Sequence, residues 1–218
     1  MNRRSLWTHL AAAAAGIALA AGLAAGRAAQ PGDLDPHDPK AMQAAMEAYM
    51  QSIKPGKQHE FLKQFEGTWT TTTKMFMDPA APPMQTSGTA TLKMIHGGRF
   101  LQHEFSGQMP MPTPDGKINN IPWTGLGLTG YDNNRKLFTF VWTDTMTTSL
   151  IAGKGSLDRT GKIMTCFGEM DEPMTGEIGK AVRYTTTVVS PDKWTFKIDE
   201  VLYGDPFTVV EVEYTRKK

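Results

Sequence analysis

Short stretches of alternating apolar and polar residues, separated by turn-forming residues, fill this chain from Thr68 to its end. A period of two is typical of β-strands that bury one face, and glycine, proline, aspartate and asparagine between such stretches indicate turns. The predicted strands cover residues 68–77, 85–95, 99–107, 123–131, 136–144, 149–157, 162–170, 181–189, 193–202 and 207–216. About ten sequential strands predict an all-β fold, an antiparallel up-and-down barrel whose closure removes exposed edges. An open sandwich is the alternative, because the pattern alone does not demonstrate closure.

The links between these strands are short, with one exception. Residues 108–122 are predicted as a long loop, which contains Met109-Pro110-Met111. Methionine is a flexible apolar side chain that suits adaptable surfaces. We therefore expect Met109 and Met111 to form a lid or a docking patch.

One or two short α-helices are predicted before the first strand. Asp38 is a good N-cap and Pro39 a good first helical residue, and Pro55-Gly56 ends the helix. The apolar residues of this segment recur at intervals of three or four and are Met42, Met46, Tyr49, Met50 and Ile53. A second helix is predicted with Gly67 as its C-terminal cap, and its apolar side consists of Phe61, Leu62 and Phe65. We expect the methionine row to dock on the barrel mouth or on a partner.

Residues 1–28 have the three parts of a secretory signal peptide. These parts are the positive start Met1-Asn2-Arg3-Arg4, the apolar run from Leu10 to Ala25, and the small residues from Ala24 to Ala29. A membrane anchor would need roughly 20 strongly apolar residues, whereas this run is shorter and mostly alanine. We expect a periplasmic or secreted protein with no stable membrane anchor after cleavage. The predicted organisation is a signal peptide (1–28), a linker with an amphipathic helix (29–55) and a barrel domain (56–218).

Charge and cysteine content exclude several classes of function. The chain has 23 Lys+Arg and 22 Asp+Glu, a balance without the basic excess that nucleic-acid binding requires. Cys166 is the single cysteine, so no intrachain disulfide forms. It lies in a predicted strand with no neighbouring histidine or basic residue, which predicts a buried, unreactive thiol. The expected state is a monomer or a homodimer.

The alternation also predicts which side chains face the barrel interior. Trp69, Thr71, Thr73, Met75 and Met77 share one face of the first strand. In the last strand, Val210, Val212, Tyr214 and Arg216 share a face. If these two strands pair antiparallel to close the barrel, Arg216 comes beside Trp69. A guanidinium stacked on the indole would then stabilise the closed end of the barrel by a cation–π interaction of ~1 kcal/mol.

The chain is similar to two groups of proteins. Gly67-Thr68-Trp69, with Arg216 at the end of the last strand, resembles the structural signature of lipocalin-like, or calycin, barrels. The chain from Lys54 onward resembles the bacterial domain-of-unknown-function family numbered 1579. The segments that carry this resemblance include Gly97-Gly98-Arg99-Phe100, the run from Gly125 to Asp132, and Trp142-Thr143-Asp144. The resemblance implies a compact β-barrel of unassigned activity, and barrels of this type usually bind small, often apolar molecules.

A small set of inward-facing residues forms the predicted ligand site. Its members are Thr71, Thr73, Met75, His103, Trp142 and Tyr184. Polar points in an otherwise apolar cavity are typical of small-molecule sites. The leading hypothesis is an exported barrel that binds a small apolar or amphipathic ligand. The alternative for these residues is that the threonine hydroxyls and the imidazole only satisfy each other.

Two further functions stay open. A hydrolase- or isomerase-like enzyme would use His103 with a carboxylate, Glu169 or Glu200, as an acid–base pair. No nucleophile motif supports it, so no catalytic residue is predicted and a non-enzyme is favoured. A soft-metal or interaction protein would use methionine pairs, because Met75-x-Met77 and Met109-Pro110-Met111 resemble the thioether pairs that Cu(I) favours.

No cofactor and no metal site is predicted. His96 and His103 lie in one predicted hairpin, ~13 Å apart along the ladder, so they cannot share an ion, and no spacing supplies three or four converging ligands. Haem binders of the nitrobindin type use a histidine late in the barrel, and no histidine follows His103. Gly125-x-Gly127-x-x-Gly130 lacks the strand–turn–helix context of a dinucleotide site. Its glycines instead predict a strand that approaches another group closely.

Overall fold

A computed structural model describes residues 37–113, 115–173, 175–201 and 206–218. The predicted signal peptide and the first part of the predicted linker lie outside the described residues. The chain divides into two compact units between Lys54 and Pro55.

The first unit contains helix α2 (Pro39–Ser52). Asp38 caps it as predicted, since its carboxylate accepts a hydrogen bond from the backbone N–H of Lys40 at 2.9 Å. The predicted apolar row is exposed at Met42, Met46, Tyr49 and Met50. Among the described residues, no helix has the length and apolar character needed to cross a membrane.

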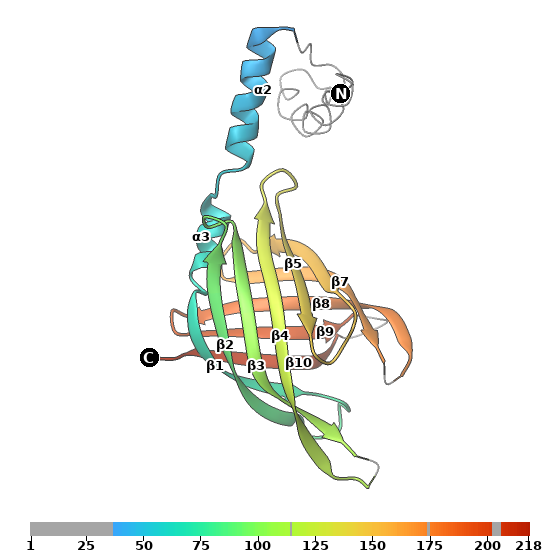
Figure 1. Cartoon of the computed structure of the whole chain (residues 1–218). Helices are drawn as coiled ribbons and strands as arrows, with labels where there is room; N and C mark the ends of the chain where they lie inside the picture. The colour runs from blue at the N-terminus through green and yellow to red at the C-terminus, as the bar shows by residue number, and fades with distance from the viewer. Residues whose placement is uncertain (1–36, 114, 174, 202–205) are drawn as a thin grey trace, which may run out of the picture. The chain divides into compact units, whose positions relative to one another are not determined.

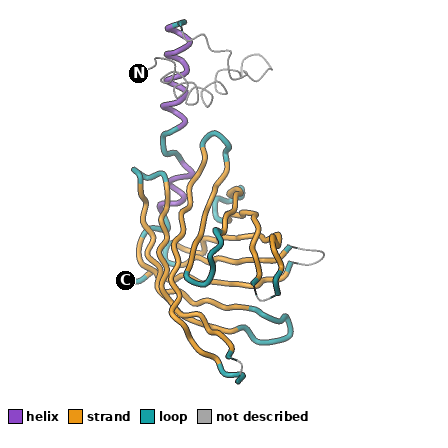
Figure 2. Tube along the Cα trace, turned by 45° about the vertical axis from the view of Figure 1, so that its right-hand side comes forward, coloured by secondary structure: helices purple, strands orange, loops and turns teal. Residues whose placement is uncertain are grey.

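The second unit begins with helix α3 (Lys57–Lys63), which ten strands follow. The strands are β1 (Gly67–Met75), β2 (Met84–Ile95), β3 (Phe100–Pro112), β4 (Ile118–Asp132), β5 (Leu137–Asp144), β6 (Ile151–Leu157), β7 (Ile163–Glu172), β8 (Glu177–Ser190), β9 (Lys193–Glu200) and β10 (Phe207–Arg216). Each strand pairs antiparallel with its neighbours in sequence, and β1 pairs with β10. The sheet is therefore a closed up-and-down barrel, which confirms the predicted fold and excludes the open sandwich (Figures 1 and 2).

The closure between β1 and β10 places Trp69 opposite Arg216. The Arg216 guanidinium carbon lies 4.0 Å from the centroid of the Trp69 ring. The same guanidinium donates to the carbonyl oxygen of Glu66 at 2.7 Å, and the Trp69 indole N–H donates to that of Phe65 at 2.9 Å. This cluster fixes the segment between α3 and β1 onto the end of the barrel.

Helix α3 packs its apolar side into the barrel core near the start of β1 (Figure 1). Phe61 packs edge-on against Phe138 of β5, and Phe65 packs edge-on against Trp194 of β9. Gly67 was predicted as the C-terminal cap of this helix, but Gln64 is the cap and Gly67 is the first residue of β1. The helix thus contributes apolar side chains to the interior from one end.

The prediction of a long loop over residues 108–122 is wrong. β3 and β4 pair continuously from Phe100 opposite Gly130 to Pro112 opposite Ile118. The N–H of Thr113 donates to the carbonyl of Lys117, so the odd-numbered residues of β3 occupy the hydrogen-bonded pairs of this ladder. Pro110 lies in one of the other pairs, in which the backbone N–H of the β3 residue points away from β4. A proline, which has no N–H, therefore removes no hydrogen bond from this ladder. Met109 and Met111 therefore lie on a strand and form no loop lid.

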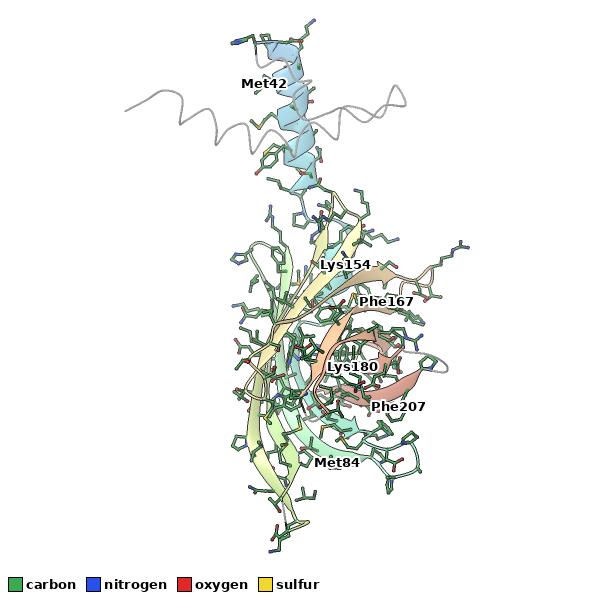
Figure 3. The ribbon with its side chains drawn as sticks, turned by 90° about the vertical axis from the view of Figure 1, so that its right-hand side faces the viewer. Met42, Met84, Lys154, Phe167, Lys180 and Phe207 are labelled. Carbon is green, nitrogen blue, oxygen red and sulfur yellow. The ribbon has the colours of Figure 1, made fainter. Side chains whose placement is uncertain are left out.

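Polar and apolar residues alternate across the barrel wall as the pattern predicts. The inner side chains of β1, from Trp69 to Met75, are buried. Lys74 on the outer face forms an ion pair with Glu211 of β10. On the opposite side of the barrel, Lys154 of β6 pairs with Phe167 of β7, and both are exposed on the outer face (Figure 3).

Candidate functional site

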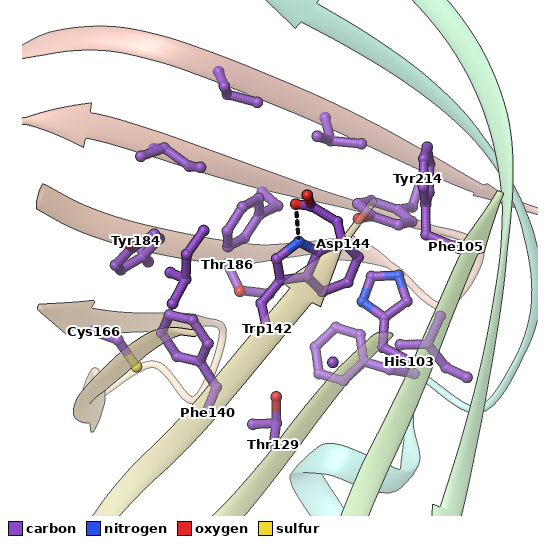
Figure 4. A pocket seen from close by; sticks show the side chains of 18 of the residues that line it. His103, Phe105, Thr129, Phe140, Trp142, Asp144, Cys166, Tyr184, Thr186 and Tyr214 are labelled. Atoms are coloured by element: carbon purple, nitrogen blue, oxygen red, sulfur yellow. Dashed lines mark hydrogen bonds between the residues drawn. The ribbon is translucent and has the colours of Figure 1, made fainter. Parts of the chain in front are cut away.

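The barrel interior contains a cavity of about 280 Å³ that is partly open to solvent. All ten strands and α3 contribute to its lining, which is mainly apolar and aromatic (Figure 4). Leu62 of α3 and the adjacent Phe65 border it from one end of the barrel. A cavity of this size lies just below the ~300–1,000 Å³ of typical ligand sites, so the interior is not a completely filled core.

The predicted site residues lie on the inner face, and all but one of them border the cavity. Thr73, Met75, His103, Trp142 and Tyr184 line it. Thr71 is buried on the same face of β1 but is not part of the lining, and its hydroxyl oxygen has no hydrogen-bond partner among the described residues. Strand parity therefore placed these side chains on the correct face.

His103 stands among aromatic rings. Its ring centroid lies 5.3 Å from that of Trp142, 5.8 Å from Tyr214 and 6.4 Å from Trp194. Burial lowers the pKa of His103 from 6.5 to about 4, so the imidazole is neutral near pH 7. Its Nε2 atom is buried and has no partner among the described residues. The Nε2 atom of the imidazole and the Thr71 hydroxyl therefore do not satisfy each other.

Trp142 and Asp144 form a fixed unit at the end of β5. The indole N–H of Trp142 donates to Oδ2 of Asp144 at 2.8 Å, and the backbone N–H of Met146 donates to Oδ1 at 2.8 Å (Figure 4). The indole lies directly against β4, where a Cβ on Gly125 would be 2.1 Å from its Cζ2 atom and one on Gly127 would be 2.9 Å from its Cε3 atom. These glycines leave room for the ring, as the strand interpretation of the glycine motif predicts.

Only one methionine of each predicted thioether pair lines the cavity. Met75 and Met109 line it, whereas Met77 lies beyond the end of β1 with 61% of its surface exposed, and Met111 is not part of the lining. Neither predicted thioether pair therefore faces the cavity together. In the part of the chain that the structure describes, no group of three or more His, Cys, Asp or Glu side chains is arranged to hold a metal ion.

The proposed acid–base partners of His103 lie elsewhere. Glu169 is exposed, because its odd position in β7 points outward, opposite to the inward Cys166 and Met170. Glu200 accepts a hydrogen bond from Lys180 at 2.6 Å and does not line the cavity. The geometry therefore provides no His103–carboxylate pair of the kind that the sequence suggested.

Cys166 lines the cavity, but its thiol is unreactive. It is buried, and burial raises the pKa of its thiol to about 12. Burial likewise raises the pKa of the Tyr184 hydroxyl to about 12 and shifts the pKa of Tyr214 upward. These groups are thus neutral over the physiological pH range.

Several cavity residues were not among the predicted ligand residues. Trp123, Trp194 and Tyr214 line the cavity, and Trp194 stacks on Tyr214 with ring centroids 3.4 Å apart. The indole nitrogens of Trp123 and Trp194 are buried without a hydrogen-bond partner in the described residues. Parity did indicate the inward direction of Tyr214, but the sequence contains no signal for which rings meet across the barrel.

Fold and site together define a class: a closed antiparallel β-barrel with an aromatic internal cavity and a neutral histidine. Residues 54–216 match the family described as "Protein of unknown function (DUF1579)". The chain belongs to this family, which confirms the resemblance noted in the sequence. No curated protein matches the chain.

The solved structures that are similar to the chain include two with 15% sequence identity. A redesigned β-barrel has 15% sequence identity and a TM-score of 0.36, and the match covers 72% of this chain and 95% of that one. The crystal structure of Rv2717c from M. tuberculosis also has 15% identity, with a TM-score of 0.48 and coverage of 76% of this chain and 100% of that one.

Proposed function

We propose that this protein is exported and binds a small apolar or amphipathic ligand inside its barrel. The observation that carries the proposal is the cavity of about 280 Å³ with its aromatic lining. Clefts and cavities lined by apolar and aromatic side chains with a few polar groups are typical of small-molecule sites. Burial of ligand surface would contribute ~25 cal/mol for each Å² of apolar area removed from water.

The unsatisfied polar atoms support a binding role over a purely structural core. His103 Nε2, Trp123 Nε1 and Trp194 Nε1 are buried without partners among the described residues, and all three residues line the cavity. Leaving a buried polar group unpaired costs ~1–3 kcal/mol. A core serving only stability would gain from apolar residues at these positions, so their presence favours a functional role for this wall.

Binding of a neutral fluorescent probe tests the proposal. The mature chain is titrated with N-phenylnaphthylamine, whose fluorescence rises in apolar surroundings, and saturable binding with one site per barrel is expected. Thr129→Trp places a large side chain in the cavity wall and should abolish binding. Thr143→Trp is the matched control, because Thr143 is exposed on the adjacent strand. Equal binding by both variants, or no binding by the native chain, would refute a ligand site in the barrel.

Export is tested separately. Expression of the full chain in a Gram-negative host, followed by fractionation and N-terminal sequencing, should give a periplasmic or secreted product that starts within or just after residues 24–29. A cytoplasmic product that retains Met1 would refute export and leave the binding proposal untouched.

A further inference from the structure

One charged side chain of the described residues lines the cavity, and it is acidic. No lysine or arginine of the described residues lines the cavity, and the neutral His103 supplies no positive charge. Lys180 is buried on the inner face of β8, opposite the lining residue Met170. Its charge is paired with Glu200 at 2.6 Å and Glu177 at 3.2 Å, and it is not part of the lining. Asp144 is the single carboxylate of the described lining.

Asp144 has hydrogen bonds but no counter-ion. Both of its oxygens accept hydrogen bonds, from the Trp142 indole and from the backbone N–H of Met146, and these donors carry no formal charge. No Lys, Arg or His of the described chain forms an ion pair with it. The carboxylate is half-buried and held in a fixed position beside the cavity. A partly buried charge of this kind favours a cationic partner.

The wall next to Asp144 suits a cation in a second way. The Trp142 indole, which is hydrogen-bonded to Asp144, contributes to the lining, and so do the rings of Phe140 and Tyr214 (Figure 4). Trp194 also belongs to the lining. Organic ammonium groups are attracted to aromatic faces, most strongly to tryptophan. An anionic ligand would instead lose its hydration without meeting a compensating charge.

We propose that the ligand is a lipophilic organic cation, whose ammonium group pairs with Asp144 against the Trp142 ring while its apolar body fills the cavity. This inference rests on the proposed ligand site and specifies the charge of what that site accepts. It predicts weaker binding of fatty-acid anions, for which the described lining offers no Lys or Arg side chain.

Three probes that share one alkyl chain test the charge preference. n-Octylamine, n-octanol and n-octanoate are titrated into the mature chain by calorimetry near pH 7, where the amine is cationic and the acid is anionic. The expected order of affinity is amine, then alcohol, then carboxylate, with at least a ~10-fold preference for amine over alcohol. The inference is overturned if the amine binds no more tightly than the alcohol, or if the carboxylate binds most tightly. This comparison uses the native chain and therefore does not depend on an Asp144 variant that folds.

Two charge-neutralising variants locate the effect. Asp144→Asn should weaken amine binding ~10-fold and change alcohol binding less than ~2-fold. Glu104→Gln removes the same charge from the exposed outer face of β3 and should change neither. Equal weakening of amine and alcohol by Asp144→Asn would refute a role for its charge. Binding of the neutral fluorescent probe without any preference for the amine refutes this inference alone, whereas no binding of any probe refutes the ligand site itself.

Discussion

Replacement of Arg216 by alanine measures how much stability the barrel closure draws from one side chain. The guanidinium donates hydrogen bonds to the carbonyl oxygens of Glu66 at 2.7 Å, Gln64 at 3.0 Å and Pro191 at 3.0 and 3.1 Å. It also stacks over Trp69 at 4.0 Å. One side chain therefore joins the segment before β1, the turn between β8 and β9, and the end of β10.

The expected loss follows from the surroundings of each contact. The bond to Glu66 is partly buried and charge-assisted, worth about 1.5 kcal/mol. The stack on Trp69 contributes about 1 kcal/mol. The other bonds, and the ion pair with Asp192 at 3.3 Å, face solvent, so each adds less than about 0.5 kcal/mol. We expect Arg216→Ala to lower the free energy of unfolding by about 3 kcal/mol.

Urea unfolding followed by tryptophan fluorescence provides the measurement, with two companion variants. Arg216→Lys keeps the positive charge but lacks the planar guanidinium group. Its loss in the free energy of unfolding should be more than half of that caused by Arg216→Ala. Arg135→Ala is the control, because its side chain is 73% exposed and its one ion pair, with Asp132, spans 3.7 Å; its loss should stay below about 0.5 kcal/mol. An Arg216→Ala protein as stable as the control, or an Arg216→Lys protein as stable as the native one, would refute the reasoning.

Three further predictions concern the cavity. Gly125→Ala should destabilise the barrel by about 2 kcal/mol or more in urea, because the new methyl collides with the Trp142 ring. Gly56→Ala meets nothing within 4 Å and should cost no more than about 1 kcal/mol, through a weaker N-cap of α3. Burial lowers the pKa of His103 from its ordinary 6.5 to about 4 in the folded chain. Between these two pH values the unfolded chain binds a proton that the folded chain does not. The free energy of unfolding should therefore fall as the pH is lowered from 6.5 to about 4, by up to roughly 3 kcal/mol. His103→Phe should flatten that part of the urea stability profile, and an unchanged slope would contradict the assignment. Cys166, whose burial raises its pKa to about 12, should resist iodoacetamide in the folded chain and react in urea; rapid labelling without urea would show an accessible thiolate.

The arrangement of the wall follows from the sequence because the period of a strand is two. With Trp69 facing inward, Thr71, Thr73 and Met75 follow on the same face. Register was also predictable where turns are tight, since Leu92 lies opposite His103 as the Gly97-Gly98 turn requires. The pairing of the first and last strands then places Arg216 beside Trp69.

The loop prediction failed because proline normally indicates a loop or the end of a strand. Pro110 and Pro122 both occupy pairs of the β3–β4 ladder in which no N–H is needed. Local composition cannot distinguish a proline in such a pair from one that ends a strand, since the difference depends on the partner strand. The length of this hairpin was therefore beyond the sequence pattern.

The contacts between aromatic rings across the site were also beyond local patterns. His103, Trp142 and Tyr214 belong to β3, β5 and β10, yet the ring centroids of Trp142 and Tyr214 lie 5.3 and 5.8 Å from that of His103. Such contacts depend on the diameter and stagger of the closed barrel. Whether the interior is hollow depends on the summed volume of all inward side chains, which parity does not determine.

The structure separates the contacts that hold the barrel closed from the proposed recognition group. Phe138, near the start of β5, packs against Phe61 of α3 with ring centroids 5.7 Å apart, whereas Asp144 ends the same strand, about 20 Å further along it. Substitutions far apart without shared partners act almost independently. The end of the barrel held by α3 and Arg216 therefore contributes the closing contacts, while Asp144, the proposed recognition group, lies on a part of β5 that those contacts do not involve.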